Sequence, residues 1–503
     1  MFAYGVMPPL MFVGMIIFML YGFPVAFSLA AVGLFFGVLG VFTGHFEQVF
    51  LQALPFRVFG IVSNDLLLAI PFFTFMGAIL ERCGLAEDLL EGTGKLFGAV
   101  PGGLAYAVIV VGAILGAITG TVAASVITMG VISLPIMLKY GYNPRLATGV
   151  IAASGTITQV IPPSLVLIVL ADQLGRSVGD MYLGAIGPSI LQVTIFLLFI
   201  LALSILRPKD VPALPPEARG EMNAALIMRV LWGMIPSIVL IFLVLGTIFL
   251  GLATPTEAGA LGVVGAMGIA ALHGRLTWDL TRQGMHTTMQ ITSMVVFILV
   301  GATCFSLVFQ GMNGGLWIEH LLSHVPGGAL GFLIFVNIFI FFLAFFLDFF
   351  EIAFIVIPML VPVANALGID LIWFGVLICI NMQTSFMHPP FGFALFYLRS
   401  IAPKSVRTKD IYLGAIPWLG MQLILVAVVI FWPESVTYWI DKAPEVDLDT
   451  IKIEVPGFGN GGGNQMPNFG LPPMDGAPAQ PGGLPGPGLP GMPNLGEPPK
   501  INP

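Results

Sequence analysis

Residues 153–164 read ASGTITQVIPPS, and residues 381–390 read NMQTSFMHPP. In each stretch, hydroxyl and amide side chains stand directly before a proline pair, within otherwise apolar sequence. Proline lacks a backbone N–H and breaks a helix, so each stretch predicts an interrupted helix. Irregular backbone at membrane depth persists only where it is buried in protein or lines a cavity. The two interruptions therefore predict a pair of broken membrane helices around an internal site.

The two stretches occupy corresponding places in an internal repeat. Pro135 and Pro162 are separated by the same interval as Pro362 and Pro389, which gives one common offset of 227 residues. A YLGAI string that follows the first broken helix recurs after the second one, 230 residues later. Chance similarity between apolar sequences does not keep prolines and a five-residue string in register, so we infer two homologous halves.

The composition is that of a membrane protein. Of 503 residues, 57% are hydrophobic and only 9% are charged, whereas soluble proteins carry about 25% charged residues. Spans of roughly 20 residues leave room for about ten to twelve crossings of a lipid bilayer. A net charge of −7 without a basic patch argues against nucleic acid as a partner. The scattered cysteines Cys83, Cys304 and Cys379 form no metal-binding or disulfide pattern.

Apolar blocks of span length follow one another along most of the chain. Residues 45–64 mix charged and aromatic side chains, which is typical of an amphipathic helix at the membrane surface. Residues 434–503 form a tail that is largely Gly/Pro-rich and is expected to be disordered. The expected membrane segments are 8–22, 24–40, 66–80, 103–138, 145–170, 187–206, 230–250, 256–272, 290–310, 330–367, 371–398 and 412–433.

Charge placement predicts the orientation, because Lys and Arg near span ends mark the cytoplasmic side. Block 103–138 has basic residues on both flanks and a break at Thr119–Thr121, so we expect a re-entrant hairpin entered from the cytoplasm. Its counterpart, 330–367, has no basic residue near it and is expected to open outside. The predicted fold is an all-α polytopic membrane protein with two inverted repeats, 1–206 and 230–433. A cytoplasmic linker, 207–229, joins them, and the C-terminal tail is predicted to be periplasmic.

Inverted repeats with hairpins and broken helices are the architecture of secondary transporters, whose sites lie near the membrane midplane. The tip of the first hairpin and the two broken helices supply hydroxyl, amide and backbone oxygens, which suit an alkali cation. Small polar residues also help helices pack, but their clustering at equivalent breaks favours binding. Gly155 is expected to permit unwinding. The candidate sodium- and substrate-binding residues are Thr119, Gly120, Thr121, Ser154, Gly155, Thr156, Thr158, Pro162, Pro163, Asp348, Asn381, Gln383, Thr384, Ser385, Pro389 and Pro390.

Acidic residues inside a membrane are costly and default to functional hypotheses. Asp348 and Glu351 fall at the bend of the second hairpin, where they either serve a cation or proton or cap a helix. Glu257 in ATPTEAG is explained by a capping box with Thr254. His388 is more readily a hydrogen-bonding strut than a proton relay. No ATP-binding loop, metal-ligand spacing or nucleophile–base pair is visible, so we expect neither an enzyme nor a cofactor.

These segments resemble the large membrane subunit of tripartite ATP-independent periplasmic (TRAP) transporters over residues 8 to 433. The similarity rests on LLAIPFFTFMGAILERCGLAEDLL, GAITGTVAASVITMG, ASGTITQVIPPS, DMYLGAIGPS, GLATPTEAGALG and FLDFFEIAFIVIPMLVP with HPPFGFALF. The resemblance implies sodium-driven import of carboxylates across the bacterial inner membrane by an elevator-type movement. It also implies a periplasmic substrate-binding protein and a small four-helix membrane subunit, here expected on a separate chain.

By the same resemblance, the hairpin tip and the two broken helices form two sodium sites that flank the substrate. This chain departs from the family at TSFMHPPFGFALF, where many members have a smaller, more Gly/Thr-rich run, which implies a different substrate or cation detail. A stand-alone dicarboxylate or citrate carrier that needs no binding protein remains an alternative. A membrane scaffold without a transport path is the other, but a scaffold needs no polar clusters at the midplane.

Overall fold

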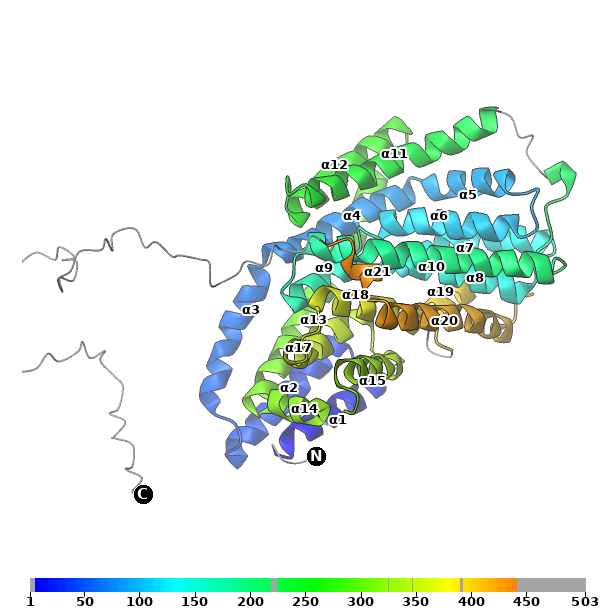
Figure 1. Cartoon of the computed structure of the whole chain (residues 1–503). Coiled ribbons are helices and arrows are strands. Elements are labelled where there is room, and N and C mark those ends of the chain that lie inside the picture. The colour runs from blue at the N-terminus through cyan, green and yellow to red at the C-terminus, as the bar shows by residue number, and fades with distance from the viewer. Residues whose placement is uncertain (1–4, 219–223, 324, 346, 390–391, 441–503) are drawn as a thin grey trace, which may run out of the picture. The chain divides into compact units, whose positions relative to one another are not determined.

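The computed structural model describes residues 5–218, 224–323, 325–345, 347–389 and 392–440, and every regular element in these ranges is a helix (Figure 1). Within them, seven helices are long and apolar enough to cross a membrane, and a pair bent by 46° forms an eighth candidate. Several apolar helices are shorter, such as Leu165–Leu174 with 10 residues and Gly328–Leu343 with 16, fewer than the roughly 20 that a span needs. Several of the predicted membrane segments are therefore hairpin arms or halves of broken helices, as the sequence suggests.

The first half contains two N-terminal helices, a bent pair, a hairpin, a broken helix and one long helix. Its elements are α1 (Met7–Leu20), α2 (Val25–Thr43), η1 (Gln48–Ala53), α3 (Leu54–Val62), η2 (Asp65–Leu68), α4 (Ala69–Arg82), α5 (Leu85–Leu96), α6 (Gly103–Thr119), α7 (Val122–Lys139), α8 (Pro144–Thr156), η3 (Ile157–Gln159), α9 (Leu165–Leu174) and α10 (Val178–Leu206).

The second half repeats this order after η4 (Pro216–Ala218). Its elements are α11 (Ala224–Phe249), α12 (Pro255–Leu272), α13 (Trp278–Gly311), α14 (Gly314–Ser323), α15 (Gly328–Leu343), α16 (Phe349–Glu351), the π-helical η5 (Ile352–Val356), α17 (Ile357–Ala366), α18 (Leu371–Met382), η6 (Gln383–Phe386), α19 (Phe393–Ile401), α20 (Thr408–Phe431) and α21 (Glu434–Thr437).

Local signals recur at the repeat offset. Asn143 caps α8 and Asp370 caps α18, each by accepting a backbone N–H of the helix's first turn. The preceding glycines, Gly141 and Gly368, have φ of +81° and +67°, a left-handed conformation that glycine adopts without a Cβ penalty. Both broken helices therefore begin with the same turn chemistry, as the sequence repeat predicts.

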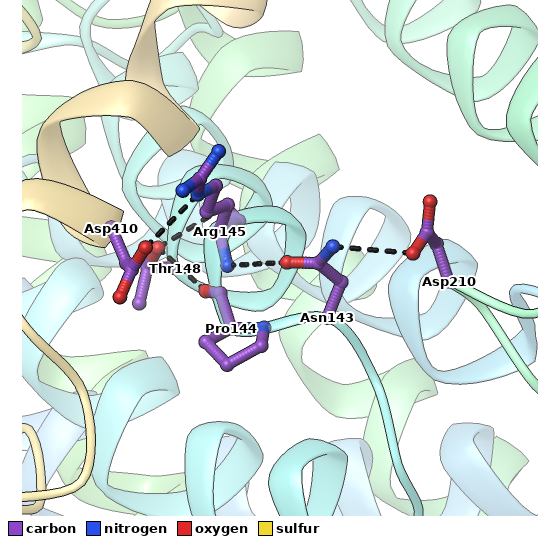
Figure 2. Close-up of polar contacts among 6 residues, drawn as sticks. All are labelled: Asn143, Pro144, Arg145, Thr148, Asp210 and Asp410. Atoms are coloured by element: carbon purple, nitrogen blue, oxygen red, sulfur yellow. Dashed lines mark hydrogen bonds and ion pairs between the residues drawn. The ribbon is translucent and has the colours of Figure 1, made fainter.

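A polar cluster joins the start of α8 to the linker and to the start of α20 (Figure 2). Asn143 accepts from the Arg145 backbone N–H at 3.0 Å and donates from Nδ2 to Asp210 Oδ1 at 3.2 Å. Arg145 Nε donates to Asp410 Oδ1 at 2.9 Å. The ion pair is partly exposed and adds at most about 1 kcal/mol. Its geometry places the linker and the starts of α8 and α20 at one end of the helices.

The two long repeat helices, α10 and α20, run in opposite directions. At the C-terminal end of α10, the Ser204 hydroxyl donates to the carbonyl of Pro101, just before the first hairpin. Near its other end, Gly184 of α10 packs against Ile372 at the start of α18 and Val436 beyond the end of α20. The first hairpin therefore opens at the end where α20 starts, and α18 starts at the opposite end. This is the arrangement of inverted repeats.

The helices pack as two sets. In one set, α2 and α4 pack against α13, and α12 packs against α4. In the other, α6 to α10 pack with α18 to α20. In this second set α8 and α20 approach closely: a Cβ added at Gly149 would lie 2.2 Å from the Gly414 carbonyl oxygen. These two glycines let two backbones from different repeats meet.

Candidate functional site

The first hairpin packs its glycines against the first broken helix. A Cβ on Gly112 of α6 would lie 2.8 Å from Ser154 Cβ, and one on Gly116 would lie 3.0 Å from Thr158 Cα. α6 ends at Thr119, Gly120 turns the chain with φ of +63°, and Thr121 is the N-cap of α7. The break predicted at Thr119–Thr121 is therefore present, and the hairpin lies directly on the hydroxyl-bearing stretch.

The first broken helix unwinds later than the sequence suggests. α8 continues in helical conformation through Thr156, so the expectation that Gly155 unwinds the helix is wrong. Glycine is required there by packing, since a Cβ on Gly155 would lie 2.2 Å from Val126 Cγ2 of α7. The chain leaves helical geometry after η3 and passes through Pro162 and Pro163. It becomes helical again at α9.

Hydroxyl groups line both breaks in the same manner. Thr156 and Thr158 donate to the carbonyls of Ala153 and Gly155 at 2.8 and 3.0 Å. In the second repeat, Thr384 and Ser385 donate to backbone carbonyls three residues earlier, each at 2.6 Å. A hydroxyl that donates in this way keeps its lone pairs for a ligand. All four hydroxyl residues are buried.

The second hairpin contacts the second broken helix through an amide and a ring stack. Asn381 Nδ2 donates to the backbone carbonyl of Asn337 in α15 at 2.8 Å. The His388 ring stacks on Phe345, with centroids 4.4 Å apart, and meets Phe341 edge-on at 4.2 Å. His388 is 1% exposed, and neither ring nitrogen has a hydrogen-bond partner in the part of the chain described. The expectation of a hydrogen-bonding strut is therefore wrong, because aromatic packing holds this ring.

The two breaks meet each other. Cys379 Sγ of α18 donates to the Gln159 carbonyl at 3.3 Å, and Thr156 Oγ1 lies 3.9 Å from Met387 Sδ. The predicted polar stretches of both repeats therefore form one buried centre. Pro389 follows His388 in the second break, whereas Pro390 and the Thr119 side chain lie outside what the structure describes.

Gln383 points towards the long helices. Its Oε1 accepts hydrogen bonds from Gln192 Nε2 of α10 at 2.6 Å and from Gln422 Nε2 of α20 at 2.5 Å. All three side chains are fully buried. The two donors occupy equivalent places in the repeats, since they are separated by the same 230 residues as the YLGAI strings. This buried amide cluster fixes the start of η6 against both repeats.

Asp348 and Glu351 form a capping box at the start of α16. Asp348 Oδ1 accepts from the Phe349 backbone N–H at 2.6 Å, and Glu351 Oε2 accepts from the Asp348 N–H at 2.7 Å. Thr254 and Glu257 form the capping box that the sequence predicts. The helix-capping interpretation of Asp348 is thus present in the structure, since its side chain also accepts from the Glu351 backbone N–H in the capping box.

Sequence reasoning missed three buried amides: Asn337, Gln192 and Gln422. Asn337 interrupts the apolar run FLIFVNIFIFF, where a lone amide is a functional signal in its own right. The glutamines could have been paired through the repeat offset. Within the described residues, four buried side-chain oxygens around the breaks have no hydrogen-bond partner: Ser154 Oγ, Gln159 Oε1, Asn337 Oδ1 and Asn381 Oδ1. Gln422 Oε1, in the amide cluster beside them, is a fifth.

Comparison with known proteins agrees with this architecture. The solved structure of the Alcanivorax borkumensis YdaH transporter aligns with a TM-score of 0.55 at 15% identity, covering 76% of this chain and 88% of that one. The two chains therefore share a fold.

Relatives that are similar in sequence identify the family more closely than the shared fold does. The C4-dicarboxylate TRAP transporter large permease protein DctM of Pseudomonas aeruginosa is 28% identical over 385 residues, which cover 76% of this chain and 88% of the relative. The sialic acid TRAP transporter large permease protein SiaM of Vibrio cholerae is 26% identical over 414 residues, which cover 82% and 93%. Residues 12–435 match the family described as "Tripartite ATP-independent periplasmic transporter, DctM component". This multi-pass membrane protein therefore belongs to the DctM family of TRAP transporter large permeases.

Proposed function

We propose that this chain is the permease subunit of a sodium-coupled transporter that imports organic acids across the bacterial inner membrane. A periplasmic binding protein delivers the substrate, and a small membrane subunit on a separate chain completes the complex. The names of the relatives support this class, since they include permeases for C4-dicarboxylates and for sialic acid. Their substrates share a carboxylate, so the proposal is restricted to that feature.

The proposal of a coupling ion rests on one observation: around the two breaks, within the residues that the structure describes, four buried oxygens have no hydrogen-bond partner. An unsatisfied buried polar atom costs about 1–3 kcal/mol, and a hard cation compensates oxygen atoms of this kind. None of the four belongs to a carboxylate. A neutral oxygen cage suits sodium and does not suit a proton, which needs a titratable base.

The two sets of helices support an elevator movement. Hairpins, broken helices and the long helices α10 and α20 hold the polar centre, while α2, α4, α12 and α13 pack mainly among themselves. We propose that the set with the hairpins and broken helices moves as a unit against the other set and carries the substrate with it. The amide cluster around Gln383 keeps the two repeats together during this movement.

Ser154→Ala tests the sodium site, because it removes one oxygen and leaves the backbone of α8 in place. The sodium concentration for half-maximal uptake into vesicles should rise several-fold. Ser28→Ala is the matched control: Ser28 is also buried, but its hydroxyl donates to the Pro24 carbonyl within its own helix. An unchanged sodium dependence in Ser154→Ala would remove this residue from the cation site.

The partner proposal has its own test. Vesicles that contain this chain and the small subunit should take up a carboxylate only when the binding protein is added. Uptake at the same rate without the binding protein would identify a stand-alone carrier.

A further inference from the structure

A polar cleft of about 340 Å³ lies apart from the broken helices, between α3, α9, α13 and η5–α17. Its walls therefore come from both sets of helices, since α3 packs on α13 and α17 packs on α9. Figure 1 shows α3 running separately along one side of the described helices, near α13. Clefts between moving parts are common places for small-molecule sites.

Among the described residues, one cationic side chain lines this cleft. Arg57 of α3 is exposed, and it forms no ion pair with any residue that the structure describes. Thr303 and Ser306 of α13 bring hydroxyl groups to the same cleft and are half-buried. A guanidinium binds a carboxylate through two parallel hydrogen bonds. Neighbouring hydroxyls suit the hydroxyl or keto groups that organic acids carry.

Within the described structure, the acidic residue that lines the cleft, Asp172, is already hydrogen-bonded within the protein. Asp172 Oδ1 accepts from Asn64 Nδ2 at 2.8 Å, and its Oδ2 accepts from Gln173 Nε2 at 2.8 Å. Both carboxylate oxygens therefore have amide donors from the protein, while the guanidinium of Arg57 has no carboxylate among the described residues. The neutral amides do not cancel the charge of Asp172, so the cleft carries one positive and one negative side chain. Because both oxygens of Asp172 are already hydrogen-bonded, Arg57 is the charged group left to bind a carboxylate.

The cleft also adjoins the second hairpin. Phe354 of η5 and Pro358 of α17 form part of its wall. η5 is a π-helical segment of five residues that directly follows the Asp348–Glu351 capping box, and such segments occur often at functional sites. A ligand in the cleft would therefore touch the second arm of the second hairpin.

We propose that this cleft is a carboxylate-binding site, in which Arg57 holds one carboxylate of an organic acid before it reaches the broken helices. The proposal deepens the proposed function and names a second place where the substrate binds. The Asn64–Asp172 hydrogen bond crosses the cleft from the α3–α4 junction to α9. Movement of one set of helices against the other would break this bond and change the shape of the site.

The test uses cysteine chemistry on the purified full-length chain, so it does not depend on transport. Thr303→Cys is introduced after Cys83, Cys304 and Cys379, all buried, have been replaced by alanine. The rates of modification by an anionic and a cationic methanethiosulfonate reagent are then compared. Arg57→Gln should lower the anionic-to-cationic rate ratio by roughly fivefold, the size expected for the loss of a nearby unit charge.

Arg57→Lys keeps the charge and should keep most of the ratio. Arg207→Gln, at the far end of α10 from α9, removes an exposed charge outside the cleft and should leave the ratio unchanged. Succinate should slow the reaction of the thiol introduced by Thr303→Cys with an uncharged reagent, and Arg57→Gln should abolish this protection. A ratio that does not depend on Arg57, or succinate protection that is the same in both proteins or absent from both, would overturn the proposal.

Discussion

At the scale of single residues, Asp348 shows why a buried acid needs two separate tests. Its carboxylate caps α16 through Phe349, and Glu351 closes the capping box. Asparagine is about as good an N-cap as aspartate, so Asp348→Asn removes the charge and keeps the cap. If Asp348 also serves the coupling cation, sodium-driven uptake should fall several-fold while the melting temperature stays within a few degrees of the wild type.

The chain offers a matched control for this substitution. Asp370 caps α18 by accepting from the Trp373 N–H at 2.8 Å, and it is exposed at the end of the helices. Asp370→Asn should change neither uptake nor stability. Normal sodium-driven uptake in Asp348→Asn, measured beside Asp370→Asn, would leave Asp348 as a helix cap alone.

Single residues also show where sequence reasoning stops. The polar residues of both breaks could be predicted, because prolines mark the breaks and an alkali cation needs oxygen ligands. The direction of the Gln383 side chain could not be predicted. Only the fold brings Gln192 and Gln422 to one amide oxygen of Gln383, which gives this amide a positioning role between the repeats and makes it a weaker candidate for a direct ligand.

At the scale of elements, close packing of helices depends on glycines that make room for a neighbouring helix and do not bend their own. The sequence predicts both hairpins and both breaks from prolines, glycines and the repeat. It assigns unwinding to Gly155, whereas that glycine lies within α8 and admits the α7 backbone, with Val126 N 3.1 Å from the position of an added Cβ. Periodicity and composition cannot distinguish a glycine that bends a helix from one that lets a neighbour approach.

Two glycines of α20 test this packing within one helix. A Cβ on Gly414 would lie 2.1 Å from the Arg145 carbonyl oxygen of α8, whereas Gly420 has no neighbour within 4 Å of such a Cβ. Overpacking of this kind typically costs about 1–3 kcal/mol. Gly414→Ala should therefore lower the thermal unfolding midpoint in detergent, and Gly420→Ala should not. Equal midpoints would show that α8 and α20 separate at little cost.

At the scale of the whole described chain, two inverted halves meet at one polar centre. The breaks of α8–α9 and α18–α19 contact each other through Cys379 and Gln159, and the long helices α10 and α20 join the same centre through glutamines. The sequence predicts this symmetry because its two halves share prolines and the YLGAI string. The predicted position of the C-terminal tail concerns residues outside the described part of the chain.

The most direct test of sodium coupling is uptake of a carboxylate by reconstituted vesicles that contain this chain, the small subunit and the binding protein. One set of vesicles has an imposed sodium gradient without a pH gradient, and the other has a pH gradient in sodium-free buffer. A cation site of neutral oxygens predicts accumulation with the sodium gradient and none with the pH gradient. Equal accumulation under the pH gradient alone would contradict the account and would shift the coupling role to Asp348 and His388.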